Sequence, residues 1–436
     1  MAYDGWMTLG DVEIINSSKT WHAATQAGVP LLCGDSCPDL AYTLNDSSYV
    51  ESQVFPWSDD ALAPDGFLGF IGQGIDGLDS GVSTRVITEL AGEGATVGAL
   101  RRGRRELTVH VLAVALSEEA LNYGIAWLNS VVRGSVCGSA CLGDVLCFYD
   151  LCPDSETGTI SADDLHHARL KNIFNVGILE APTVVSKVRL GEVCGGDEPA
   201  DAWTAELTFM LVAGSPGIYS DPDLVVTVDS ADWVVDTSIA GTCNDPVGCR
   251  VDPTCAVPPL PPVVPVPTDP CAEPGAGPFE RYMATIPNGL MSDWFEKVPV
   301  IVVQNGAFEM RDLSVSFAGN PSGVPCASLG GTTLQWCDFC EILYVPYIPA
   351  RGSLIVDGRT RSAVVECPAA GTSAVTGLVS VSQAKIYGGY VFGQGSQLFT
   401  WPVFECGQTY CVQFRREDYS TASTINLYIS ERRDAT

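Results

Sequence analysis

One stretch of the chain, residues 104–134, constrains the fold more than any other, because a strand pattern runs directly into a helix pattern. Apolar and β-branched side chains alternate with a period of two over residues 107–115, which is typical of a strand. Ser117 can accept hydrogen bonds from a first helical turn, and Glu118 and Glu119 lie where the helix dipole favours negative charge. The stretch therefore predicts a strand followed by a capped helix.

The predicted helix carries its apolar residues in one stripe. Leu121, Ile125, Leu128 and Val132 follow one another at spacings of four, three and four, and Gly134 can end the helix. No other segment has a comparably long helical pattern, so we expect strands, turns and loops elsewhere. A single amphipathic helix must bury its stripe against another layer, and here that layer has to be a sheet.

Composition narrows the class of protein. The 436 residues are 46% hydrophobic and only 17% charged, which predicts two or three domains with sizeable cores. The net charge of −29 argues against binding nucleic acid or an anionic membrane surface. The first residues lack the basic start and apolar run of a signal peptide, and no stretch approaches the roughly 20 apolar residues of a membrane span. We therefore expect no membrane insertion.

The first domain is predicted to cover residues 1–236. The Gly- and Asp-rich residues 66–81 are expected to form a loop, and residues 171–190 to form two strands broken at Ala181-Pro182. Further strands are predicted at residues 82–90, 95–100 and 202–213.

A change of composition follows the first domain. Ten prolines fall between Pro253 and Pro278, so residues 237–279 are interpreted as a semi-rigid connector. Residues 280–436 then read as all-β. Two hairpins are predicted there, at Asn305-Gly306 and at Asp357-Gly358, because both dipeptides tolerate positive φ. The number and spacing of the strands predict a two-sheet sandwich.

The seventeen cysteines are a high count, and most lie close to another cysteine in the sequence. Such a density of cysteines favours an oxidising environment, which for a cellular protein would require an export signal. A protein of a virus particle fits both observations best, since the particle assembles in the host cytoplasm and leaves by lysis. The spacing does not fix the pairing. The candidate disulfide cysteines are Cys33, Cys37, Cys137, Cys141, Cys147, Cys152, Cys243, Cys249, Cys255, Cys271, Cys337, Cys340, Cys406 and Cys411.

Three short motifs match known kinds of site only in part. Gly72, Gly74 and Gly77 match the dinucleotide-binding fingerprint, but poor helix formers follow where a helix N-terminus is needed. The Cys337–Cys340 pair lacks a second pair to complete a zinc site. His166-His167 is interpreted as an exposed loop pair rather than a metal site. No catalytic assembly, cofactor or metal is expected.

Two larger groups remain open as alternatives. The acidic cluster of Asp221, Asp223, Asp229, Asp232 and Asp236 could suggest glycoside hydrolysis, but in so acidic a chain it is interpreted as a solvated face. The candidates for stacking on carbohydrate are Tyr387, Tyr390 and Trp401, although strand aromatics more often belong to a core.

Several stretches together resemble the minor tail proteins of long-tailed actinobacterial phages, in the order of the distal tail protein. They are the strand–helix unit at 104–133, the strand at 207–213 before Pro216-Gly-Ile-Tyr219, and the segment 401–407 before a strand. The resemblance implies an N-terminal β-sandwich or split-barrel-like ring domain with one helix and a C-terminal galectin-like sandwich. It also implies a hexamer that links the tail tube to the other tail-tip proteins.

The sequence therefore predicts a non-enzymatic structural protein of the virion. A ring of such acidic copies would let DNA pass through its lumen without binding. The alternative is a tail-tip adhesin whose C-terminal sandwich binds host cell-wall carbohydrate, and a cell-wall hydrolase is a third option.

Overall fold

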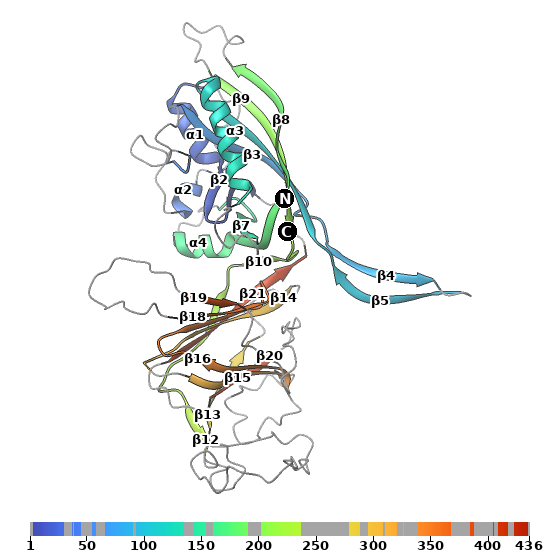
Figure 1. The fold of residues 1–436 in the computed structure, drawn as a ribbon, viewed down its shortest axis with the longest axis vertical. Coiled ribbons are helices and arrows are strands. Elements are labelled where there is room, and N and C mark those ends of the chain that lie inside the picture. Colours follow the sequence, from blue (N-terminus) through green and yellow to red (C-terminus); the bar gives the residue numbers. More distant parts are fainter. Residues whose placement is uncertain are drawn as a thin grey trace. The chain divides into compact units, whose positions relative to one another are not determined.

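The computed structural model of the chain describes residues 3–29, 37, 39–44, 55–57, 66–89, 93–134, 143–153, 160–190, 202–236, 279–287, 295–307, 310–320, 326, 339–367, 384–387, 404, 409–416 and 423–434. The chain divides into two compact units (Figure 1). Unit 1 contains Met1–Asp221 and Arg432–Thr436, and unit 2 contains Pro222–Glu431. The paired strands are antiparallel, which confirms the prediction of a mainly β protein.

Unit 1 is built from two groups of antiparallel strands that share β8. One group has the order β2-β1-β7-β8-β10 and the other β3-β6-β9-β8, while β4 and β5 form a separate two-stranded sheet. The strands are β1 (Tyr3–Leu9), β2 (Val12–Asn16), β3 (Phe67–Asp76), β4 (Ser83–Glu89), β5 (Ala95–Arg102), β6 (Arg105–Ala115), β7 (Asp144–Tyr149), β8 (Leu170–Leu190), β9 (Ala202–Ala213) and β10 (Ile218–Ser220). The described strands do not close a barrel.

The predicted strand–helix unit is confirmed. After β6, the Ser117 hydroxyl accepts a hydrogen bond from Ala120 N at 3.1 Å and opens helix α3 (Glu118–Val132). Leu121, Leu128 and Val132 are buried in one core with residues of β3, β6 and β9. The predicted sheet therefore does receive the apolar stripe of the helix.

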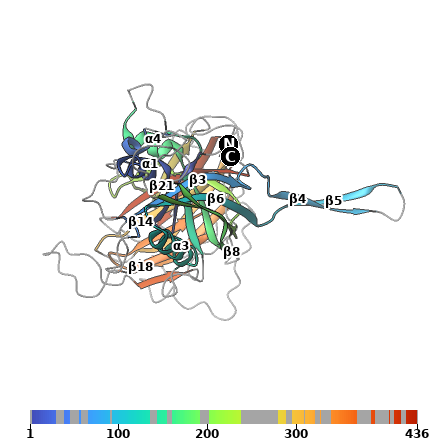
Figure 2. The same cartoon turned by 90° about the horizontal axis from the view of Figure 1, so that it is seen from above.

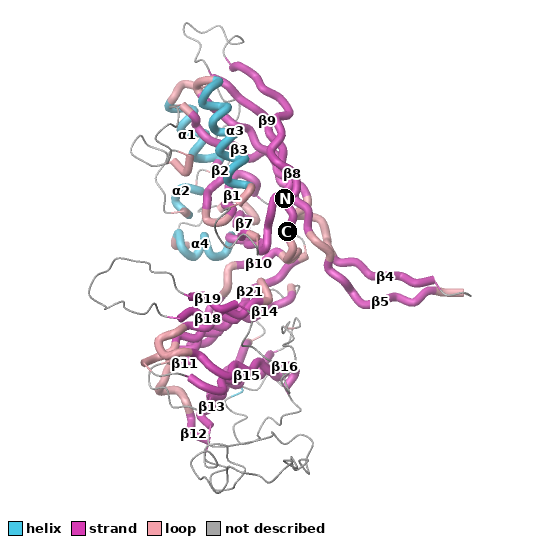
Figure 3. Tube along the Cα trace, viewed as in Figure 1, coloured by secondary structure: helices cyan, strands magenta, loops and turns pink. Residues whose placement is uncertain are grey.

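The expectation of a single helix is wrong. The described residues also contain α1 (Ser17–Gln26), α2 (Leu40–Thr43) and α4 (Ala162–Arg169), and Figure 3 shows the helices on one side of β8 and β9. Helix α1 was not predicted, because the face that it buries against β3 carries hydroxyl side chains instead of a stripe of large apolar residues. Thr20 Oγ1 donates to Phe70 O at 3.2 Å, and Ser17 Oγ accepts from Gly72 N at 2.9 Å.

The expected loop at residues 66–81 is also wrong, because most of it is strand β3. Its glycines allow other elements to approach closely: a Cβ on Gly72 would lie 1.9 Å from Asp4 O of β1, and one on Gly69 2.4 Å from Thr20 Oγ1 of α1. The two strands expected in residues 171–190 are one continuous strand, β8. Register shifts against β9 between Glu180 and Thr183 accommodate Ala181-Pro182 as an irregularity.

Unit 2 is a sandwich, as predicted. One sheet has the order β19-β18-β17-β14-β21-β11 and the other β12-β13-β20-β15-β16, and side chains from both form one buried core. The strands are β11 (Asp223–Val228), β12 (Val234–Asp236), β13 (Phe279–Ile286), β14 (Glu296–Gln304), β15 (Met310–Asn320), β16 (Phe339–Ile348), β17 (Ser353–Asp357), β18 (Ser362–Cys367), β19 (Ala384–Tyr387), β20 (Thr409–Arg416) and β21 (Thr424–Arg433).

One of the two predicted hairpins is present. Strands β17 and β18 pair around Asp357-Gly358, although Arg361 rather than Gly358 takes the positive φ of 55°. The Asn305-Gly306 hairpin is wrong, because β14 and β15 belong to different sheets. The Asn305 amide instead donates to Ile348 O at 3.2 Å and to Pro349 O at 2.9 Å.

Strand pairing places residues 223–236 in unit 2, whereas the sequence predicts them in the first domain. β11 pairs with β21, and β12 pairs with β13. These long-range pairings leave no signal in the local sequence. The proline-rich connector lies outside the described residues, except for its last residue, Phe279, which begins β13.

Candidate assembly surface

Strands β4 and β5 form a two-stranded ribbon, which we call the arm (residues 83–102). They pair with each other, from Ser83↔Arg102 to Glu89↔Ala95, and with no other described strand. Figures 1 and 2 show the arm extending away from the body of unit 1. Its large apolar side chains are exposed: Val86 by 50%, Ile87 by 64% and Val97 by 59%. An isolated two-stranded ribbon is only marginally stable in water. We therefore expect another protein surface to cover these apolar side chains.

The root of the arm is held by a buried arginine. The Arg105 side chain is 1% exposed, and its guanidinium donates to backbone carbonyls of two loops and of the C-terminal segment. The acceptors are Gly77 O at 2.6 Å, Leu78 O and Ser80 O at 3.1 Å, Pro216 O at 2.8 Å, and Asp434 O. Burial lowers the pKa of Arg105, against the opposing effect of the Asp434 charge.

The carboxylate of Asp434 holds both strands of the arm. It accepts a hydrogen bond from Ser83 at the start of β4, and its Oδ1 lies 3.0 Å from Arg102 Nε at the end of β5. Burial alone would raise the pKa of Asp434, but the bonds from Ser83 and Arg102 outweigh it and leave that pKa below its usual value. The base of the arm is therefore fixed to unit 1, whereas Val86, Ile87 and Val97 farther along it are exposed.

A second exposed strand surface lies on β8. Residues 178–190 pair with β9 along one edge, and no described strand pairs with the other edge. Four of these residues are exposed large apolar side chains: Leu179, Val184, Val185 and Val188. A strand edge of this kind can be a template for another strand, but here Pro182 has no N–H to donate and three register shifts against β9 make the strand irregular.

The histidines predicted to lie in an exposed loop are on helix α4 instead. His166 Nδ1 is 2.7 Å from the hydroxyl of the buried Tyr149, and His167 Nδ1 is 2.7 Å from Asp221 Oδ2. Burial lowers the pKa of His166. The two rings therefore anchor α4 to two different segments, and the described residues contain no cluster of three or more metal-ligating side chains.

The acidic cluster is divided between the two units. Asp221 is the last residue of the first segment of unit 1, and its carboxylate contacts His167. Asp229 and Asp232 lie in one turn of unit 2, where Asp229 N donates a hydrogen bond to Asp232 Oδ2 at 2.9 Å. These two contacts bring no pair of carboxylates together around a common reacting atom. The acidic residues that they involve have structural partners in their own units.

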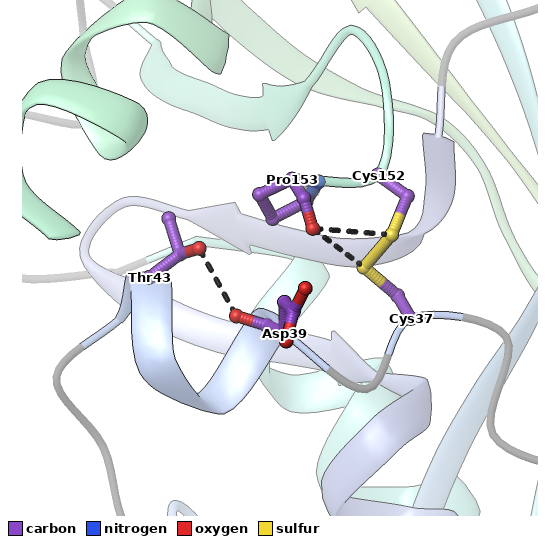
Figure 4. Close-up of a disulfide and its surroundings, with 5 residues drawn as sticks. All are labelled: Cys37, Asp39, Thr43, Cys152 and Pro153. Carbon is purple, nitrogen blue, oxygen red and sulfur yellow. Dashed lines mark hydrogen bonds between the residues drawn. A yellow bond between two sulfur atoms is a disulfide. The ribbon is translucent and has the colours of Figure 1, made fainter. Parts of the chain in front are cut away.

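The described disulfides join cysteines that are far apart in the sequence. Cys37 bonds to Cys152 across a separation of 115 residues (Figure 4), and Cys326 bonds to Cys411 across 85. The pairing that the sequence left open therefore joins Cys37, Cys152 and Cys411 to distant cysteines and not to their sequence neighbours. Cys326 was missed because no other cysteine lies close to it in the sequence.

The first disulfide lies in a small core with Trp6, Leu40 and Tyr149, and Cys147 of β7 packs against the same core. The remaining candidate cysteines have side chains outside the described residues: Cys33, Cys137, Cys141, Cys243, Cys249, Cys255, Cys271, Cys337, Cys340 and Cys406. The same holds for the carbohydrate-stacking candidates Tyr387, Tyr390 and Trp401.

Neither exposed strand surface is predicted as a site from the sequence. A usable signal was present for the arm: residues 83–105 hold five arginines and two glutamates in a chain of net charge −29. The β8 edge had no such signal, because its exposure depends on where the sheet ends. Among the described helices, none combines the length and apolar character needed to cross a bilayer.

No known protein family and no curated protein matches the sequence. Solved structures similar to this chain include a phage hub protein and phage baseplates, the class that the sequence resemblance names. The Dit protein of phage SPP1, described as a paradigm of the hub adsorption apparatus in phages that infect Gram-positive hosts, has a TM-score of 0.36 and 13% identity. That match covers 83% of this chain and 93% of the Dit chain.

A chain of the phage P2 baseplate, in its activated conformation with Ca, has a TM-score of 0.35 and 8% identity, over 84% of this chain and 92% of that chain. The p2 baseplate with Sr gives 0.34 and 10% over the same shares, 84% and 92%. At these TM-scores and identities the likeness carries no conclusion about function. A functional conclusion has to rest on the residues of this chain.

Proposed function

We propose that this protein is a structural component of a phage tail in which unit 1 assembles head to tail into a closed ring. The observation that carries the proposal is the amount of strand surface left uncovered in unit 1. The arm exposes Val86, Ile87 and Val97, and the outer part of β8 exposes an edge with four large apolar side chains. Both surfaces belong to a unit that already has its own buried core.

Two different exposed surfaces on one unit favour a heterologous contact, in which one surface of a copy meets the other surface of the next. Such contacts close into a ring when the rotation between copies permits it. The sequence resemblance implies six copies, placed between the tail tube and the other tail-tip proteins. The proposal needs no catalytic group and no cofactor.

The acidic balance has a use in such a ring. Carboxylates along the lumen would repel the DNA phosphates and let the genome pass without binding. This part of the proposal concerns where the charge lies. An electron microscopy map of the assembled ring with a neutral or basic lumen would contradict it.

The experiment that tests the ring is the oligomeric state of the purified full-length protein. We expect one closed species by light scattering and annular particles by negative-stain electron microscopy. A protein that stays monomeric at every concentration, with or without other tail proteins, would overturn the proposal. A signal on a glycan array would instead support the adhesin alternative.

A further inference from the structure

We propose that the C-terminal residues Arg432–Asp434 are a latch that holds the arm in one direction, and that the arm swings about its root when the Asp434 carboxylate is released. This device does not depend on the ring, because it acts within a single chain. It would decide how the arm is presented to whatever covers it.

The latch is seated on unit 1 by strand pairing. Arg432 is opposite Tyr219 of β10, and its side chain is buried. Arg433 is opposite Ile218 of the same strand. Asp434 follows directly, so the two paired residues before it fix where its backbone lies.

Asp434 connects the latch to both strands of the arm. Its carboxylate accepts a hydrogen bond from Ser83 of β4, and its Oδ1 lies 3.0 Å from Arg102 Nε of β5. Ser83 and Arg102 are opposite each other in the first pair of the arm register, so one side chain bridges the base of the ribbon. Bonds to two strands fix a direction, whereas a bond to one strand would leave rotation about it. Charge-assisted bonds such as the one to Arg102 are the strong kind.

A glycine lies at each of the two connections between the arm and unit 1. Gly81 precedes β4, and a Cβ added there would meet no atom within 4 Å. Gly103 follows β5, and its added Cβ would meet only Val82 O, at 3.9 Å. Glycine has the widest backbone freedom, and hinges are a few loop residues that absorb changes of φ and ψ. Both connections can therefore act as hinges.

The two connections are also joined to each other. Gly103 N donates to Val82 O at 3.0 Å, next to the first pair of the arm, so the ribbon would move as one body. The arm root thus combines two hinge positions with one carboxylate that holds both strands. A seated latch presents the exposed Val86, Ile87 and Val97 in one direction. An arm held in advance loses less conformational freedom when a partner covers it.

The test is Asp434→Ala in the full-length chain. This variant removes the carboxylate from Ser83 and Arg102 but keeps the backbone carbonyl to which Arg105 donates. The matched control is Glu106→Ala, which removes an exposed ion pair with Arg104 beside the arm root. Thermal unfolding checks that each variant folds.

The direction of the arm is read as a distance within unit 1. Spin labels are attached through unnatural amino acids at Thr88 on the arm and Glu119 on α3, both exposed, because the seventeen cysteines preclude thiol labelling. Pulsed electron paramagnetic resonance measures the distance distribution. The chain is measured at a dilution where light scattering finds single chains, since a partner on the arm would also hold it.

We expect one narrow distance in the unmodified chain and in Glu106→Ala, and loss of that single distance to a broad distribution in Asp434→Ala. Adding Gly81→Ala and Gly103→Ala to Asp434→Ala should narrow the distribution again, because both sites have room for a methyl group. A narrow distribution in Asp434→Ala, or a broad one in the unmodified chain or the control, would overturn the latch. A distribution that stays broad with both alanines would overturn the hinges. None of these outcomes depends on whether the chain forms rings.

Discussion

At the residue scale, the buried side chain of Arg105 connects separate segments of unit 1. Its guanidinium joins the 77–80 loop, the loop before β10 and the C-terminal segment through five backbone carbonyls. We expect Arg105→Lys to lower the free energy of unfolding by about 2–4 kcal/mol, because an ammonium cannot reach several of these acceptors and leaves them buried and unpaired. Urea denaturation measures the change.

The control for this prediction is the adjacent Arg104→Lys. Arg104 is exposed and pairs with Glu106 at 2.6 Å on the surface, so we expect a change within about 0.5 kcal/mol. Equal losses in the two variants would mean that burial of the Arg105 guanidinium does not matter to stability.

His166 predicts a pH dependence of stability. Burial lowers its folded-state pKa below 6.5, so as the pH falls the unfolded chain takes up a proton on this ring before the folded protein does. Stability is therefore complete above the unfolded value and decreases as the pH falls through it. We expect the Tm measured between pH 7.5 and 5 to decrease with acid, and the decrease to be smaller in His166→Gln.

Other groups titrate in the same experiment, so the difference between variants carries the argument. Asp434 has a lowered pKa, and its contribution is lost only as the pH falls below about 4. His110→Gln is the matched control. His110 lies on β6, and its half-exposed ring faces Asp76 at the end of β3. A pH slope that changes as much in His110→Gln as in His166→Gln would contradict the assignment to His166.

At the element scale, the sequence predicted the parts whose pattern is local. Helix α3 was predictable because Ser117 caps it and four apolar residues form its stripe. Helix α1 was not, because Thr20 and Ser17 are buried against β3 and make its buried face look polar. Strand β3 looked like a loop because its glycines serve close packing with β1 and α1, a need that appears only once those elements are in place.

The glycines of β3 give a prediction that separates the packing interpretation from the nucleotide-binding motif. A Cβ at Gly72 would lie 1.9 Å from the Asp4 carbonyl oxygen, and this neighbour is backbone that cannot move aside. We expect Gly72→Ala to destabilise unit 1 by about 2–4 kcal/mol. Measurement of the unfolding midpoint in urea tests it.

Gly74→Ala is the control, since its added Cβ would meet only the His110 ring at 3.9 Å, an ordinary contact. We expect its midpoint to lie close to that of the unmodified chain. In a phosphate-binding loop both glycines would matter for ligand approach rather than for stability. A Gly72→Ala variant as stable as Gly74→Ala would contradict the packing interpretation.

At the scale of the whole molecule, the sequence predicted a mainly β chain with a C-terminal sandwich but not where the units divide. Residues 223–236 follow the first unit in sequence, yet β11 and β12 pair with β21 and β13, which are far along the chain. The disulfide pairing could not be predicted for the same reason. The spacing of cysteines in the sequence identifies those close along the chain, whereas the bonded cysteines are close only in the folded structure. Each of the two described disulfides lies within one unit.

That division predicts two separate stabilising effects. A disulfide that closes a loop of 85 or 115 residues restricts the unfolded chain and typically contributes about 2–5 kcal/mol. We expect Cys37→Ser/Cys152→Ser to increase hydrogen exchange in the strands of unit 1 alone. Cys326→Ser/Cys411→Ser, its matched control, should do so in unit 2 alone. Loss of protection in both units from either double variant would mean that the units unfold as one, and would contradict independent stabilisation.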